Sequence, residues 1–168
     1  MPWKNVIASG DIPVSPELVW SLVRDFCGKW HPAISTMGAE HDKSGRLLRV
    51  FTVHSQDVVY RERLTWFSDS DRSMSYTHVE GIHGVEIYNA QLLVSNNKDG
   101  GARITMTAKL LAPDPRDEEI AIGTKKIFDE AIIEIKKLTK LPMPLQAPSN
   151  PNFAYDKPIQ TFAFGDTP

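Results

Sequence analysis

The chain has 168 residues, of which 41% are hydrophobic and 24% are charged, and its formal net charge is −2. Such values are typical of one globular domain, and the interspersed basic and acidic residues form no basic stripe that would neutralise phosphates. No apolar run approaches the ~18 residues that cross a bilayer, and the first residues lack the hydrophobic region of a signal peptide. Cys27 is the only cysteine, which rules out an internal disulfide or a cysteine-based zinc cage. We therefore expect a cytoplasmic protein that neither binds nucleic acid nor inserts into membranes.

The first part of the chain predicts one strand followed by two short helices. Trp3–Ile12 mixes apolar and polar positions as a strand does. Ser15 and Pro16 suit the N-cap and the first position of a helix, and apolar side chains follow at helical spacing. A cysteine-glycine-lysine string ends that helix, and Trp30–Ile34 is expected to form a second short helical turn or a loop.

The middle of the chain predicts a series of strands separated by polar turn clusters. Five segments of eight to eleven residues alternate in the manner of strands, and a sixth is weaker. The five are Arg46–His54, Val58–Phe67, Ser73–Glu80, Glu86–Asn96 and Ala102–Ala112, and the weaker one is Thr36–Glu40. Because the connections are short, neighbouring strands should be antiparallel.

One long helix is predicted from Arg116 to Lys140. This stretch contains no proline, and its apolar residues recur at intervals of three, four and seven. Acidic residues in its first turn and lysines in its last turn suit the helix dipole. Asp114 is the expected N-cap, with Pro115 at the first helical position. At about 1.5 Å per residue the helix spans roughly 35–40 Å, enough to cross a small domain.

These elements predict an α+β domain over residues 1–140. A curved antiparallel sheet of about seven strands would wrap around the long C-terminal helix, with two short helices after the first strand. A curled sheet against a single helix tends to leave an interior space near one end of the helix. Residues 141–168 contain six of the twelve prolines and four aromatic residues. We expect a tail there that is either solvated or packed on the domain, on a dimer partner or on the cavity mouth.

Several short sequence strings occur in a specific order and are followed by the long helix, so that the whole arrangement covers roughly residues 3–140. They are Ser15-Pro16-Glu17-Leu18-Val19-Trp20, Val23-Arg24-Asp25-Phe26, Trp30-His31-Pro32, Glu62-Arg63-Leu64, Tyr76, Gly81 and Tyr88. In order and spacing they resemble the SRPBCC superfamily of START-like, helix-grip domains. Within it they are most similar to the polyketide cyclase/dehydrase-like group and, more distantly, to the plant abscisic acid receptors. The strings indicate the fold more specifically than the function.

The resemblance implies a hydrophobic ligand cavity between sheet and helix, closed by two loops called gate and latch in the plant receptors. The gate would lie at Ser55-Gln56-Asp57, and the latch at Gly81-Ile82-His83-Gly84. The receptor gate's glycine-leucine-proline string is absent, and the latch lacks the arginine that follows the receptor's histidine. These departures argue against hormone sensing and leave a lidded pocket possible.

Glu62 is the first candidate for chemistry. Strand alternation groups Glu62 with Leu64 and Trp66, and the resemblance turns that face inward. A lone carboxylate among apolar residues would have a raised pKa and could serve as acid, base or hydrogen-bond anchor. The alternative is a structural pairing with a cation or a backbone group on a neighbouring strand.

Further polar candidates come from the following strands and from the loop after the first helix. The resemblance points Tyr76, His78 and Tyr88 into the cavity, where with Glu62 they would form a polar patch on one wall. Such a patch suits ligand binding, or proton transfer to a carbonyl group. Core packing of the tyrosines and a satisfied buried histidine remain the alternatives. His31 would contact the ligand near the place of a receptor lysine, or would only shape a turn.

The expected ligand contacts combine this patch with apolar residues from strands and helix. They are His31, Phe51, Val53, Glu62, Leu64, Tyr76, His78, His83, Tyr88, Ile120, Gly123, Ile127, Ala131 and Ile135. If the protein is an enzyme, Glu62, His78 and Tyr88 would be its catalytic residues. The five histidines lack metal-binding spacing, and no phosphate loop, nucleophile elbow or Rossmann fingerprint is present, so no metal or cofactor is expected.

Three functions follow from these expectations. The leading one is binding of a small hydrophobic or aromatic molecule in the internal cavity. The second is a cofactor-independent polyketide cyclase, dehydratase or isomerase that uses general acid/base residues in that cavity. The third is an interaction module that forms a homodimer and holds no ligand, which would have a filled interior and an exposed apolar patch.

Overall fold

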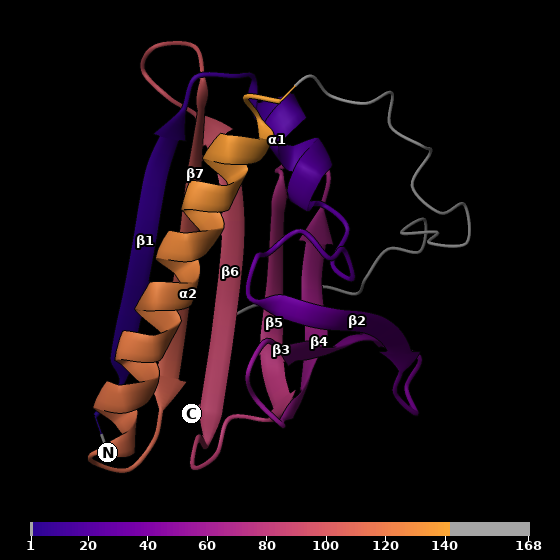
Figure 1. Cartoon of the computed structure of the whole chain (residues 1–168), viewed down its shortest axis with the longest axis vertical. Helices are drawn as coiled ribbons and strands as arrows, with labels where there is room; N and C mark the ends of the chain where they lie inside the picture. The colour runs from indigo at the N-terminus through magenta and orange to yellow at the C-terminus, as the bar shows by residue number, and fades with distance from the viewer. Residues whose placement is uncertain (1, 142–168) are drawn as a thin grey trace.

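The computed structural model describes residues 2–141 and confirms the α+β helix-grip fold. The helices are α1 (Pro16–Val23) and α2 (Arg116–Leu138). The strands are β1 (Lys4–Ile12), β2 (Ile34–His41), β3 (Leu47–Val53), β4 (Val59–Ser68), β5 (Ser73–Glu80), β6 (Ile87–Asn96) and β7 (Ala102–Leu111). They form one antiparallel sheet in the order β1-β7-β6-β5-β4-β3-β2 (Figure 1). Residues 142–168, which include almost all of the expected tail, lie outside the described residues.

Helix α2 packs on one side of the sheet, against β1 and β7 (Figure 1). The contact is close at Gly10, where an added Cβ would lie 2.7 Å from Cγ2 of Ile132. Phe128, Ala131 and Ile135 of α2 are buried in the same core. Because α2 rests on β1 and β7, it leaves the inner face of β3, β4 and β5 uncovered.

Helix α1 closes one end of the sheet against β6 and β7. Its start follows the sequence, since Ser15 Oγ accepts the backbone N–H of Leu18 and Pro16 occupies the first turn. Trp20 donates its indole N–H to Asp69 at 2.7 Å, and its ring lies 5.5 Å from that of Phe67. These contacts tie α1 to the turn between β4 and β5.

Two local expectations for the helices are corrected by the structure. Of the two alternatives for Trp30–Ile34 the loop is confirmed, so one short helix rather than two follows β1; the His31 side chain there binds the backbone N–H of Ala33 and a carbonyl of α2. Helix α2 begins at Arg116 without any side-chain cap, so Asp114 is not its N-cap. The first turn is instead stabilised by Asp117, which accepts the N–H of Glu118 at 2.7 Å.

The predicted alternation along β4 fails at one point. The register against β5 shifts between Leu64 and Trp66, so an irregularity there changes which side chains face the core. Phe67 packs against the core next to Trp20, whereas Trp66 donates its indole N–H to Ser73. Glu62 and Leu64 precede the irregularity and keep their inward direction, at 8% and 4% exposed.

Gly81, after β5, provides a test of the fold. Its φ is +115°, and an added Cβ would lie 2.6 Å from the Tyr60 ring. Gly81→Ala is expected to lower the free energy of unfolding by about 1–3 kcal/mol, because it adds a clash to backbone strain. Gly45 also has positive φ but meets no atom within 4 Å, so Gly45→Ala should cost only about 1 kcal/mol. Urea denaturation measures both, and equal losses would contradict the steric argument.

Candidate functional site

A cavity of about 770 Å³ lies between α2 and the strands that α2 leaves uncovered. This volume suits a drug-sized ligand. Most of its wall is apolar, with contributions from α1, from the sheet and from α2. The apolar side chains include Val23, Trp30, Ile34, Phe51, Val53, Met74, Ile82, Leu92, Met106, Ile120, Ile127 and Phe128.

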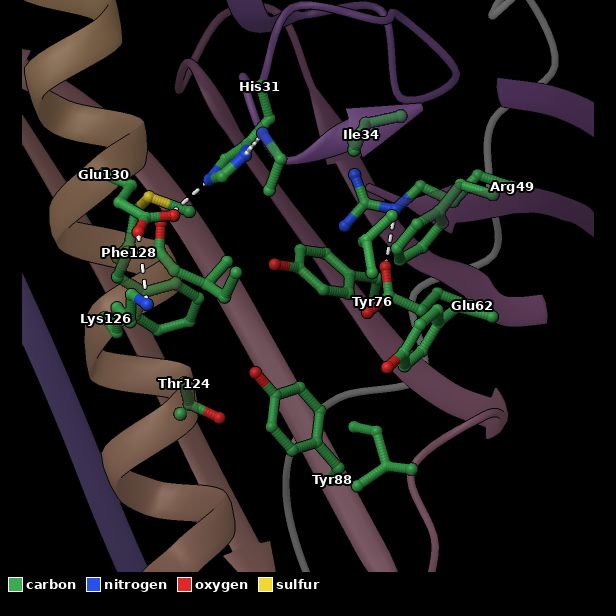
Figure 2. A pocket seen from close by; sticks show the side chains of 18 of the residues that line it. His31, Ile34, Arg49, Glu62, Tyr76, Tyr88, Thr124, Lys126, Phe128 and Glu130 are labelled. Atoms are coloured by element: carbon green, nitrogen blue, oxygen red, sulfur yellow. Dashed lines mark hydrogen bonds and ion pairs between the residues drawn. The ribbon is translucent and has the colours of Figure 1, made fainter. Parts of the chain in front are cut away.

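An ion pair forms the polar centre of the sheet wall (Figure 2). Nε of Arg49 donates to a carboxylate oxygen of Glu62 at 2.5 Å, and both side chains are largely buried. The guanidinium carbon lies 4.5 Å from the Phe26 ring centroid and 4.4 Å from that of Tyr76. The centroids of these two rings are 5.8 Å apart, so the cation packs against two neighbouring aromatic rings, which favours one orientation of the guanidinium.

Two tyrosine hydroxyls point into the cavity beside this pair (Figure 2). Burial raises the pKa of Tyr76 to about 12, and the pKa of Tyr88 is raised well above its usual value, mainly by burial. Both phenols therefore keep their protons at neutral pH and act as hydrogen-bond donors. Thr124 of α2 adds a third hydroxyl near Tyr88.

His31 joins the loop before β2 to α2 (Figure 2). Its Nε2 donates to the carbonyl oxygen of Ile127 at 2.9 Å, and its Nδ1 accepts the N–H of Ala33 at 3.0 Å. A carbonyl can only accept and an N–H can only donate, so these partners fix the tautomer. Both ring nitrogens of His31 are occupied within the protein.

Most groups that could act as a base in this cavity have protein partners. Glu62 is bound by Arg49, and His31 uses both nitrogens. Of the two other carboxylates in the wall, Glu119 is hydrogen-bonded to Arg116 and Glu130 lies 3.9 Å from Lys126. Each of these four groups would have to leave a partner before accepting a proton, and the remaining imidazole of the wall, His54, lies at an exposed position.

The structure brings nine of the fourteen predicted ligand contacts to the cavity wall and places five elsewhere. The nine are His31, Phe51, Val53, Glu62, Tyr76, Tyr88, Ile120, Gly123 and Ile127. Leu64, Ala131 and Ile135 are packed in the core instead. His78 lies in β5 and His83 in the β5–β6 turn, both outside the wall.

Sequence reasoning missed Arg49 and Thr124. Alternation along β3 puts Arg49 on the same face as Phe51 and Val53, which were both predicted to line the cavity, so this signal was present. Thr124 follows Ile120 by one helical turn and shares its face in the same way. Of the two interpretations of Glu62, the structural pairing with a cation on a neighbouring strand is confirmed, and the cation is Arg49 of β3.

The two loops expected to close the cavity each contribute one side chain to its wall. Gln56 comes from the β3–β4 turn, and its side-chain oxygen accepts a hydrogen bond from the hydroxyl of Tyr60 at 2.7 Å. Ile82 comes from the β5–β6 turn, and the His83 carbonyl next to it accepts a hydrogen bond from Arg116 at 2.9 Å. The latch is therefore tied to the start of α2 through the His83 carbonyl.

His78 stabilises the β5–β6 turn, because its Nε2 accepts the N–H of Ile82 at 2.9 Å. Burial lowers the pKa of His78 below its ordinary value of 6.5. The unfolded chain therefore binds this proton more readily, and stability should fall as the pH drops below about 6.5. His78→Gln keeps an acceptor for Ile82 and should weaken this pH dependence, as measured by urea denaturation from pH 7.5 down to pH 5. His83→Gln, at an exposed position, is the control, and an equal effect of both variants would contradict this role.

Residues 2–141 contain neither a cluster of potential metal ligands nor a helix that could span a membrane. No three His, Cys, Asp or Glu side chains in this range gather into a group that could hold a metal ion. No helix in the same range has the length and apolar character needed to cross a membrane.

Comparison with known proteins gives one family match. The family described as polyketide cyclase / dehydrase and lipid transport matches residues 5–139. A comparison with curated protein sequences gives no significant match.

Solved structures similar to this chain come from several bacteria. The protein XoxI from Bacillus cereus is 21% identical with a TM-score of 0.70, and 79% of this chain and 93% of that one are covered. The Zhui aromatase/cyclase from Streptomyces sp. R1128 is 11% identical with a TM-score of 0.71, covering 83% and 94%. A protein from Thermobifida fusca is 22% identical with a TM-score of 0.68, covering 79% and 90%. At these identities the likeness concerns the fold alone.

Proposed function

Because the chain belongs to the polyketide cyclase / dehydrase and lipid transport family, we propose that it binds a small hydrophobic or aromatic molecule in the cavity between α2 and the sheet. The supporting observation is the composition of the wall. Apolar side chains make up most of it, and a few hydrogen-bonding groups, Tyr76, Tyr88 and Arg49, gather on one side. Binding sites for small molecules have this composition.

In this binding role the apolar wall supplies most of the affinity. Removing apolar area from water contributes about 25 cal/mol per Å², and the two phenols orient whichever oxygen the ligand carries. The lone Cys27, half-buried with a pKa raised to about 11 by burial, is unreactive, and it is compatible with the cytoplasmic location that we propose.

A cyclase or dehydratase is the second candidate, favoured by the two protonated phenols that line one wall with Glu62. Tyr76 and Tyr88 could donate to a carbonyl oxygen of a polyketide-like substrate. The reaction would also need a base beside the phenols, and Glu62 would have to separate from Arg49 to provide one. A further imidazole of the wall, His54, lies at an exposed position. The pairing of Glu62 therefore favours binding over catalysis. The third function, a homodimerising module, would not need a cavity of this volume.

Mass spectrometry of the purified protein tests the proposal. Under native conditions we expect a fraction with added mass from a bound, drug-sized organic molecule, which denaturation releases. Protein without a copurified molecule should still raise the fluorescence of the neutral dye N-phenyl-1-naphthylamine. The absence of both an adduct and a dye response would overturn the binding function. Conversion of the recovered molecule during incubation with fresh protein would favour the enzyme.

A further inference from the structure

The charges that line the cavity cancel in pairs. Three cationic side chains and three carboxylates belong to its wall, and each cation has one of these carboxylates as its partner. The pairs are Arg49 with Glu62, Arg116 with Glu119, and Lys126 with Glu130. The wall therefore carries polar groups without a net charge from these six residues.

The pairs differ in depth. Arg49 and Glu62 have side chains only 17% and 11% exposed, whereas Arg116 and Glu119 are 38% and 57% exposed. Water screens the outer pairs, so they contribute little to the field inside the cavity. The Arg49–Glu62 pair is thus the one that decides how the interior receives a charged ligand.

Binding of an anionic ligand beside this pair would be unfavourable. It would lose its hydration on entering, and the attraction of Arg49 would be offset by repulsion from Glu62, which already binds the guanidinium. A neutral oxygen avoids this cost. It can accept hydrogen bonds from Tyr76 and Tyr88, whose hydroxyls keep their protons because burial raises their pKa values.

We propose that the cavity selects neutral oxygen-bearing ligands over anionic ligands of the same shape, and that Glu62 sets this selectivity by cancelling the charge of Arg49. The selectivity rests on the proposed binding function and names the class of its ligand: a neutral, mainly aromatic molecule with a phenol or carbonyl oxygen. Glu62 acts as a specificity-determining residue, since it discriminates against the wrong ligand by repulsion.

A matched pair of probes tests this selectivity. 2-Naphthol is neutral at neutral pH and 2-naphthoate is an anion, and both present the same fused ring system. Their dissociation constants are measured by displacement of N-phenyl-1-naphthylamine. We expect 2-naphthol to bind at least about tenfold more tightly to the wild-type protein, a ratio equivalent to about 1.4 kcal/mol.

Glu62→Gln should weaken or remove the preference for 2-naphthol over 2-naphthoate, because it leaves the charge of Arg49 unbalanced. The ratio of the two dissociation constants is expected to move about tenfold or more toward 2-naphthoate. Glu80→Gln is the matched control, since Glu80 belongs to an exposed pair with Arg61 and does not line the cavity, and the ratio there should stay within about twofold of wild type. The double variant Arg49→Gln/Glu62→Gln restores a neutral wall and should keep the wild-type preference.

Circular dichroism verifies that each variant is folded. If Glu62→Gln does not fold, the wild-type protein and the double variant still decide the matter. Equal or tighter binding of 2-naphthoate to the wild type would overturn the selectivity, and so would an unchanged ratio in folded Glu62→Gln. Binding of the dye with no displacement by either naphthalene would also count against it, while leaving the binding function intact. Failure of the dye itself would instead overturn the proposed function.

Discussion

Replacing Arg49 with methionine is expected to lower the free energy of unfolding by about 3–5 kcal/mol. The change leaves the Glu62 carboxylate buried at the cavity wall without the guanidinium that now binds it at 2.5 Å. It also removes the cation that packs against the rings of Phe26 and Tyr76. Urea denaturation followed by tryptophan fluorescence measures the loss.

Two further variants isolate the ion pair from other effects of the substitution. Arg61→Met, on the same strand as Glu62, removes a cation whose partners Glu40 and Glu80 are 50% and 57% exposed, and should cost at most about 1 kcal/mol. Arg49→Met combined with Glu62→Leu removes both charges and should regain most of the stability lost by the single change. A double variant as unstable as Arg49→Met would contradict the explanation by an unpaired charge.

Gly123→Trp is expected to weaken dye binding at least tenfold without destabilising the fold. Gly123 lies on α2 at the cavity wall, and an added Cβ there meets no atom within 4 Å. An indole ring at this position would occupy or cover the space that the ligand needs. Removing a glycine from the helix interior should raise stability by about 0.5 kcal/mol. Titration with N-phenyl-1-naphthylamine measures the affinity, and thermal unfolding measures the stability.

The neighbouring residue provides the control for this variant. Ile122 is 64% exposed on α2 and does not line the cavity, so Ile122→Trp adds the same ring away from the site. Its dye affinity should remain close to that of the wild type. Equal affinity of Gly123→Trp and wild type would place the dye outside this cavity.

The sequence predicted the secondary structure and the sheet well, because each element carries a local signal. Helix α2 shows helical spacing over its whole length, and short polar turns separate β3 to β7. Such signals depend only on neighbouring residues, so they can be seen without tertiary information. The inward direction of Glu62 needed the family resemblance as well, since alternation along β4 only grouped it with Leu64, and its burial confirms that direction.

The errors have long-range causes. The irregularity in β4 that turns Phe67 rather than Trp66 to the core depends on the pairing with β5 and has no mark in the sequence. Ala131 and Ile135 share the apolar face of α2 with Ile120, but only Ile120 of these three lines the cavity, whereas Ala131 and Ile135 are packed in the core. Periodicity identifies a buried face and leaves open which partner covers each part of it.

Arg49 is the part of the site that the sequence analysis left out. Arginines in strands usually lie on a solvated face, although the position of Arg49 beside Phe51 and Val53 indicated the cavity face. Its burial requires both the carboxylate of Glu62 from the next strand and the two rings that pack against it. That combination exists only once β3, β4 and β5 are assembled.

A crystal structure of the protein soaked with 2-naphthol tests the central claim most directly. The binding function predicts the naphthalene ring in the cavity between α2 and the sheet, with its hydroxyl within hydrogen-bond distance of Tyr76, Tyr88 or Arg49. Naphthol bound only on the outer surface, with the cavity left empty or filled by rearranged side chains, would contradict it.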